Sequence, residues 1–178
     1  KYVLKLHVIA AALAMKTKRP VKMVLDRHED MITAHPRVPL TFDIEIGADR
    51  EGNFLFKEVT VYGDAGARVY WSPNVLVTAC SRPDSVYHFR NVKAEGHLCY
   101  TNNSPTTCMR GFGNAEMLFA VESVIDELAL GLGIDPAEIR LKNIVRQGET
   151  TIHGYRLDTC HLDKCIQRVK GLSGWDRR

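Results

Sequence analysis

The residues of this chain best suited to chemistry lie in a short glycine-containing segment, Arg110-Gly111-Phe112-Gly113-Asn114, directly before a predicted helix. Glycine lets a backbone pass close to a ligand, and the first N–H groups of a helix point outward with partial positive charge. Arg110 adds a fork of hydrogen-bond donors. The segment could therefore hold an anion or an oxo group. A tight connection between two elements would use the same glycines, and the third glycine of a dinucleotide-binding fingerprint is missing.

Two further polar segments could contact a ligand. Asp64-Ala65-Gly66-Ala67 follows a predicted strand, and its residue types equally suit an ordinary turn. The segment 101–107 is rich in Thr, Asn and Ser. It could hydrogen-bond a polar cofactor, or its short side chains could cap their own backbone. Both alternatives stay open for each segment.

Other polar groups indicate structure rather than catalysis. His161 and Cys165 would share a helix face beside Cys160, but no fourth ligand and no Cys-x-x-Cys pair accompany them, so we predict no metal site. Glu122 and Asp126 lie one helical turn apart and suit a solvent-facing position. No Ser-His-Asp or Cys-His set has a suitable spacing, and we expect no catalytic residue within this chain.

Length and composition limit the classes of protein to which the chain can belong. With 178 residues, of which 45% are hydrophobic and 25% charged, it can form a globular domain with a substantial core. The net charge of +3 comes from interspersed basic and acidic residues, which argues against a nucleic-acid partner. No apolar run approaches the ~18 residues of a membrane span, and no signal peptide is recognisable.

The cysteines and the first residues bear on the setting of the chain. Five cysteines, odd in number and irregularly spaced, favour reduced thiols and a cytoplasmic location over a disulfide framework. The chain opens at Lys1 inside a predicted helix, with neither an N-cap nor an initiator methionine before it. We therefore expect an internal segment of a longer polypeptide.

Apolar periodicity and turn residues predict the elements that must position these groups. The first elements are a helix over 3–15, a strand over 21–25, and a charged turn or short helix over 27–31. A hairpin of strands over 40–46 and 54–61 follows, with a strand break at 63–66, and then a loop over 69–83 that could include a short helix. The last elements are a strand over 86–100 with a bulge at 95–96, a polar loop over 101–113, and helices from 114, from 136 and over 161–169.

The clearest helix begins at Asn114, which can cap it, and Gly131 and Gly133 would end it. Four apolar residues at helical spacing would form its buried stripe: Leu118, Val121, Ile125 and Leu128. Asp135 then suits the N-cap of a second helix, with Pro136 at its first position.

The order of these elements is not the regular alternation of a doubly wound sheet, so we predict an α+β fold, a two-layer arrangement of a mixed sheet packed by helices. Residues 1–178 are expected to form a single fragment in three sections. These are 1–66 with the first helix, strands and hairpin, 67–113 with a loop, a strand and the glycine-containing loop, and 114–178 with the C-terminal helices.

Several segments, taken together and in order, resemble one family. Ala10 to Ala14, Arg19-Pro20-Val21-Lys22 and Arg27-His28-Glu29-Asp30-Met31 are similar to its alanine-rich helix and the motifs that follow. Further matching segments are His35-Pro36, 64–67, 100–102, 109–113, 126–129 and 132–143. From about residue 10 to about residue 160 the chain resembles the large, molybdenum-cofactor-binding subunit of the xanthine dehydrogenase/aldehyde oxidase family.

This resemblance implies a molybdopterin cofactor with molybdenum, often a cytosine dinucleotide in bacterial members. It implies oxidation of a purine, another N-heterocycle or an aldehyde with oxygen from water, and electron transfer to iron–sulfur and FAD subunits or domains. By the match to the family's motif, Arg110, Gly111, Phe112 and Gly113 would bind the cofactor. The family's glycine-rich Phe-Gly loop and its general-base glutamate fall outside this chain, so the isolated fragment is expected to hold no cofactor and to be inactive.

The sequence also departs from the family pattern. Ala115-Glu116 stands where a Pro-Gln pair is usual, and a carboxylate in place of an amide changes the available hydrogen bonds. The arginine that holds purines in some members falls near Thr78, which argues against xanthine as the substrate. Two alternatives remain. Carbon monoxide dehydrogenase-type large subunits tend to differ at Phe112, and a non-catalytic scaffold would have a degraded site at Ala115-Glu116.

Overall fold

The computed structural model describes residues 5–82 and 86–177, and the chain divides into two compact units, 1–35 and 36–178. The larger unit contains a sheet of three strands in the order β1-β2-β3. Strand β1 (Leu40–Ala48) is antiparallel to β2 (Phe54–Gly66), and β3 (Asn91–Tyr100) is parallel to β2. The expected mixed sheet and α+β class are confirmed, and the division into three sequence sections stays a prediction.

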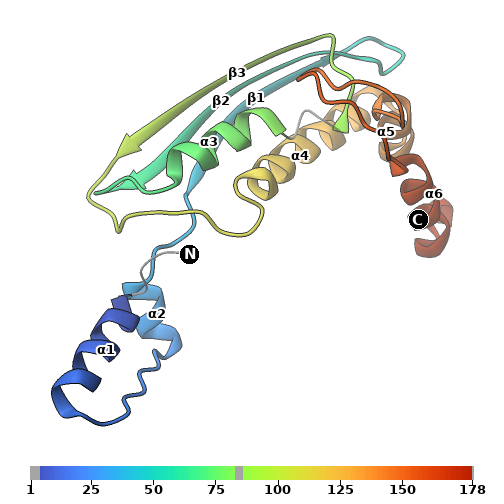
Figure 1. Ribbon diagram of the computed structural model, residues 1–178. Coiled ribbons are helices and arrows are strands. Elements are labelled where there is room, and N and C mark those ends of the chain that lie inside the picture. The colour runs from blue at the N-terminus through green and yellow to red at the C-terminus, as the bar shows by residue number, and fades with distance from the viewer. Residues whose placement is uncertain (1–4, 83–85, 178) are drawn as a thin grey trace. The chain divides into compact units, whose positions relative to one another are not determined.

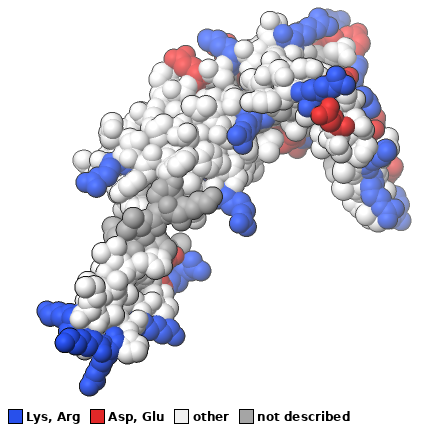
Figure 2. Space-filling model, in the orientation of Figure 1, with Lys and Arg blue, Asp and Glu red and all other residues white. Residues whose placement is uncertain are grey.

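Two helices form the second layer of the larger unit. Helix α3 (Ser72–Ser81) packs on β2 and β3, and α4 (Asn114–Leu132) packs on β1, so both cover the same face of the sheet (Figure 1). On the face of the molecule that Figure 2 shows, basic side chains are scattered over several elements and do not form one stripe.

The predicted hairpin is confirmed, and its turn is closed by Asp49, whose carboxylate accepts hydrogen bonds from the backbone and side chain of Asn53, each 2.8 Å long. The predicted strand break at 63–66 is wrong. Strand β2 runs on to Gly66 because β3 continues to pair with it there, whereas β1 pairs with it only as far as Gly63. The bulge expected at 95–96 is also wrong, since the irregularity lies between Asp64 and Gly66, and residues 86–90 precede β3 rather than belonging to it.

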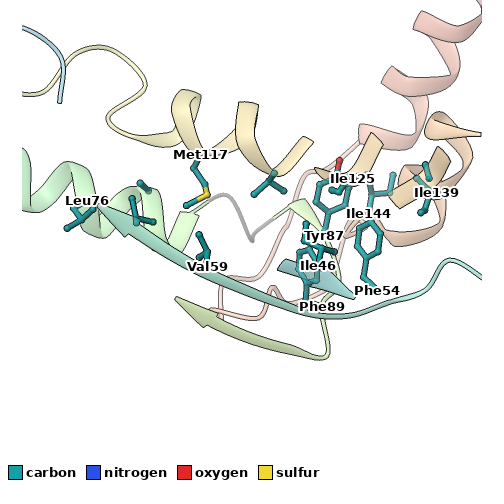
Figure 3. Packing of buried hydrophobic residues seen from close by; sticks show 14 residues of the cluster. Ile46, Phe54, Val59, Leu76, Tyr87, Phe89, Met117, Ile125, Ile139 and Ile144 are labelled. Atoms are coloured by element: carbon teal, nitrogen blue, oxygen red, sulfur yellow. The ribbon is translucent and has the colours of Figure 1, made fainter. Parts of the chain in front are cut away.

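The hydrophobic core lies between the sheet and the helices. Val59 of β2 faces Met117 of α4 (Figure 3), and both belong with Val61 and Ile125 to one cluster of buried side chains. Phe54, Tyr87 and Phe89 extend the core, with the rings of Phe54 and Phe89 stacked 5.2 Å apart. The register of the predicted stripe is partly wrong: the buried residues of α4 are Met117, Val121, Ile125 and Ala129, while Leu118 and Leu128 are half-buried.

The ends of α4 differ from the sequence-based expectation. Gly113, with a φ of 96°, is the N-cap in place of Asn114, which is the first helical residue. Gly133 ends the helix in the left-handed conformation, and Gly131 lies within it. A glycine suits the position of Gly133 because a side chain there would be strained.

The C-terminal helices are α5 (Pro136–Asn143) and α6 (Leu162–Ser173), followed by the short 3₁₀ helix η2 (Trp175–Arg177). The predicted cap of α5 is confirmed, since the Asp135 carboxylate accepts from the amides of Ala137 and Glu138 at 2.8 and 3.2 Å. The solvent-facing position expected for Glu122 and Asp126 is confirmed for Asp126, which is exposed, whereas Glu122 is half-buried. Both bind Arg140 of α5, at 2.7 and 2.6 Å.

The smaller unit consists of α1 (Lys5–Thr17) and α2 (Arg27–Thr33). Helix α1 confirms the prediction, of which residues 3 and 4 lie outside the described part. Asp26 and Glu29 form a capping box at the start of α2. The strand predicted over 21–25 is wrong, because these residues pair with no other strand within the described range. Within the part of the chain that the structure describes, no helix is both long and apolar enough to span a membrane.

Candidate functional site

The loop before α4 has an unusual backbone. Phe112 donates its amide to the Met109 carbonyl and Asn114 donates to the Gly111 carbonyl, each at 2.9 Å, so two tight turns follow one another. Gly111, Phe112 and Gly113 have φ values of 97°, 54° and 96°. Glycine reaches this region without strain, whereas a phenylalanine there is disfavoured by about 1–2 kcal/mol. The conformation of Phe112 therefore has to be held by its surroundings.

Helix α3 supplies part of that support. A Cβ on Gly113 would lie 2.5 Å from the Val75 carbonyl oxygen and 3.2 Å from the Ala79 Cβ, so the loop backbone lies directly against α3. The Phe112 ring meets the Trp71 ring edge-on, with centroids 6.1 Å apart. The glycines are thus required both for the turn and for the close approach of α3.

The loop leads into α4, whose N-terminus has no side-chain cap. Gly113 has no side chain with which to cap α4, and within the described residues the amides of Ala115 and Glu116 have no hydrogen-bond partner. The side chain of Arg110, the first residue of the loop, is exposed. Free amides, a helix dipole and an exposed arginine in one short segment favour an electronegative group, such as an oxo or phosphate oxygen.

A basic residue that the sequence did not single out also reaches this loop. Arg37 donates from Nη1 to Glu116 Oε1 at 2.5 Å and from Nη2 to the Arg110 carbonyl at 2.8 Å. The second oxygen of Glu116, Oε2, is buried and has no hydrogen-bond partner in the structure. Arg37 and Glu116 are 79 positions apart, so no local pattern reveals the pair. One local signal for a functional role of Glu116 was available: it is an acidic residue in the first turn of a helix whose N-cap is a glycine.

The two other polar segments of the sequence come together at the end of β2. Asp64 accepts from the Thr101 hydroxyl and the Asn103 amide group, both at 2.6 Å, and from the Gly66 amide at 2.7 Å. The Thr101 hydroxyl and the Asn103 amide, with the Gly66 amide, hold the pKa of the Asp64 carboxyl below its usual value. The segment 101–107 therefore stabilises the C-terminal end of β2. It is followed, two residues later, by the glycine-containing loop.

The remaining candidates lie elsewhere or have structural roles. Thr78 is buried within α3. Cys160 donates to the Val145 carbonyl, with 3.3 Å between sulfur and oxygen. Within the described residues, none of the five cysteines is in a disulfide bond. Within the described part of the chain, no group of three or more His, Cys, Asp or Glu side chains could hold a metal ion.

Comparison with known proteins supplies the family. The family model of the molybdopterin cofactor-binding domain matches residues 1–144. The chain belongs to this family. The match includes the loop at 110–113, the helix α3 that contacts it, and all of α5.

Individual relatives agree with this assignment. The chain is 33% identical to nicotinate hydroxylase of Emericella nidulans over 171 residues, 96% of this chain and 13% of that protein. It is 31% identical to the xanthine dehydrogenase molybdenum-binding subunit of Escherichia coli over 160 residues, 89% of this chain and 21% of the relative. The crystal structure of the aldehyde oxidoreductase from Desulfovibrio desulfuricans superposes with a TM-score of 0.83 at 25% identity, over 95% of this chain and 19% of that one. The chain thus spans about a fifth or less of the length of these relatives.

Proposed function

We propose that this chain is the part of a molybdenum hydroxylase that presents the loop Arg110-Gly111-Phe112-Gly113 to a molybdopterin cofactor. The observation that carries the proposal is the convergence of a strained glycine-containing turn, two free amides and an exposed arginine at the start of α4. Such a site favours oxygen atoms with negative charge, and membership of the cofactor-binding family supports this ligand.

The residues present fit such a group. Gly111 places no side chain over the Ala115 amide, whose nitrogen would lie 3.7 Å from a Cβ at that position, and the amides of Ala115 and Glu116 are available as donors. Arg110 can place its guanidinium fork on an oxo or phosphate oxygen. When bound, the molybdenum of the cofactor would supply the redox chemistry, and this chain would hold, orient and shield it.

The proposal extends to the whole protein. Its substrate would be a purine, another N-heterocycle or an aldehyde, and its electrons would pass to iron–sulfur and FAD subunits or domains. The cofactor could be the cytosine dinucleotide form. We expect the isolated chain to hold no cofactor, because it spans only 13% and 21% of relatives such as those above. Five cysteines that form no disulfide within the described residues support a reducing, cytoplasmic compartment.

The test is the molybdenum and pterin content of the whole protein purified from its own host, by plasma mass spectrometry and by fluorescence of the oxidised pterin. We expect about one of each per chain, and Arg110→Ala should lower both. Arg50→Ala is the matched control, since Arg50 is an exposed arginine in the β1–β2 turn. A folded wild-type protein without either component would favour the scaffold alternative.

The loaded protein would then be screened with aldehydes, N-heterocycles and carbon monoxide. Turnover of the first two classes supports the proposed function. Oxidation of carbon monoxide alone would assign the protein to the carbon monoxide dehydrogenase type instead.

A further inference from the structure

Arg37 is held at its backbone close to the end of the polar segment 101–107. It forms an isolated parallel bridge with Thr107, and the Thr107 amide donates to the Pro36 carbonyl at 3.0 Å. The next residue, Val38, is buried. Arg37 therefore starts from a fixed point just before β1, and the direction of its side chain is set by the fold of the larger unit.

From this point the guanidinium joins the two ends of the candidate loop. One nitrogen binds the backbone carbonyl of Arg110, where the loop begins, and the other binds the carboxylate of Glu116, in the first turn of α4. The planar fork of arginine suits two acceptors at once, which the single ammonium of a lysine cannot match. Arg37 thus spans the three residues with positive φ between these acceptors.

The loop needs such a restraint. Phe112 is held in a left-handed conformation that a phenylalanine disfavours, and α3 and the preceding Trp71 contact the loop at Gly113 and at the Phe112 ring. Arg37, which lies just before β1, contacts the loop at the Arg110 carbonyl and the first turn of α4 at Glu116. Without the guanidinium, the Arg110 carbonyl would lose its restraint and the turn could open.

Glu116 also depends on Arg37. Its side chain is only 18% exposed, and one of its oxygens is buried without a partner. A carboxylate in such a place needs a counter-charge. Arg37 provides it, so the acid that stands in place of the family's usual amide is matched by a base elsewhere in the chain.

We infer that Arg37 is a positioning residue for the cofactor: with Glu116 it fixes the Arg110-to-Gly113 loop in its binding conformation. This inference rests on the proposed function. Arg37 does not itself need to touch the ligand. Its effect would be transmitted through the Arg110 carbonyl and the first turn of α4.

The experiment compares Arg37→Met with Arg140→Met in the whole protein. Arg140 forms the other half-buried arginine–carboxylate cluster, on α4 and α5, and its side chain is more buried than that of Arg37, 17% against 39% exposed. If both arginines only stabilise the fold, Arg140→Met should have the larger effect on every property. If Arg37 positions the loop, the two variants should separate.

The first readout is hydrogen exchange in the cofactor-free protein. The amides of Phe112, Asn114 and Met117 donate within the loop and the first turn of α4, whereas the Ile139 amide donates within α5. Arg37→Met should raise exchange at the first three by at least about tenfold and leave Ile139 unchanged. Arg140→Met should do the reverse. Equal protection of the loop in both variants would overturn the inference.

The second readout is the rate at which pterin dissociates from the loaded protein. Removing a supporting contact around a cofactor typically weakens its binding about 10–100-fold. We expect Arg37→Met to release pterin faster in this range, Glu116→Gln to have a smaller effect because its amide oxygen can still accept from Arg37, and Arg140→Met to behave like wild type. A wild-type protein without pterin would refute the proposed function, whereas a loaded protein whose Arg37→Met variant retains pterin normally would refute this inference alone.

Discussion

Gly113 lies so close to Val75 that a Cβ on the glycine would be 2.5 Å from the valine carbonyl oxygen. The contact fixes the distance between α3 and the start of α4, and it leaves no room for any side chain at the glycine. At Gly113 the candidate loop is therefore held by the same contact that packs the two helices together.

This contact predicts the effect of Gly113→Ala. A methyl group there meets both a left-handed φ of 96° and the Val75 carbonyl, so the free energy of unfolding should fall by about 2–5 kcal/mol. Gly131→Ala is the matched control, because Gly131 lies within α4 and a Cβ there meets nothing within 4 Å. It should stabilise the chain by about 0.5–1 kcal/mol. Urea unfolding of both variants tests the pair, and a neutral Gly113→Ala would contradict the close approach.

Asp64 should make the free energy of unfolding of the chain decrease at acidic pH. The Thr101 hydroxyl and the Asn103 amide, together with the Gly66 amide, lower the pKa of Asp64 from its usual 3.8. Because the pKa is lower in the folded chain, this stabilisation is present above pH 3.8 and is lost as the pH falls through the folded pKa.

Asp64→Asn should therefore be less stable than wild type at neutral pH, by about 1–2 kcal/mol for the lost charged hydrogen bonds. Its unfolding free energy should also fall less steeply between about pH 5 and pH 2. Unfolding by urea across this range measures both effects. Parallel curves for the two proteins would show that Asp64 is not the group responsible.

Tyr87 should make the stability of the folded chain depend on pH in the alkaline range. Burial, and then the charge of Glu122, raise the pKa of Tyr87 well above its usual 10.0, and its hydroxyl donates to Glu122 at 2.7 Å. The folded chain keeps this proton where the unfolded chain loses it. The stability that Tyr87 contributes is thus complete below pH 10.0 and declines above it, by about 1.4 kcal/mol per pH unit.

Tyr87→Phe should remove this pH-dependent stabilisation. It should also lose the hydrogen bond to Glu122, which lowers the free energy of unfolding by about 1 kcal/mol near neutral pH. The difference between variant and wild type should then shrink and reverse as the pH rises above about 10. Tyr155→Phe is the control, since Tyr155 is 63% exposed. A constant difference between Tyr87→Phe and wild type at all pH values would contradict the burial of the hydroxyl.

The elements that sequence reasoning predicted well are those with local signals. The first strand of the hairpin alternates strictly over 40–46 and a turn segment separates it from the second strand, and α5 carries its own cap and proline, so both were found. The strand predicted over 21–25 has the same alternation, but it finds no pairing strand within the described residues. Alternation shows only that a segment suits a strand, and a partner is needed to make one.

The candidate site was predicted only in part for the same reason. The Arg110-to-Gly113 loop is visible locally through its glycines and the helix that follows. Its supports, Arg37 and α3, are distant in sequence, and only the fold brings them to the loop. Two positions on the buried face of α4 were misjudged: Met117 and Ala129 are buried in place of Leu118 and Leu128. Apolar neighbours at these positions allow either choice, and packing against the sheet decides between them.

Helix α4 allows a last comparison between its two faces. Ile125 is fully buried against the sheet, whereas Phe119 is 78% exposed. Ile125→Ala should lower the free energy of unfolding by about 2–5 kcal/mol, since it leaves a cavity in the core. Phe119→Ala, which removes a larger side chain, should change it by no more than about 0.5 kcal/mol in this chain. Chemical unfolding of both variants is the measurement. A loss at Phe119 as large as that at Ile125 would mean that the outer face of α4 is packed in solution.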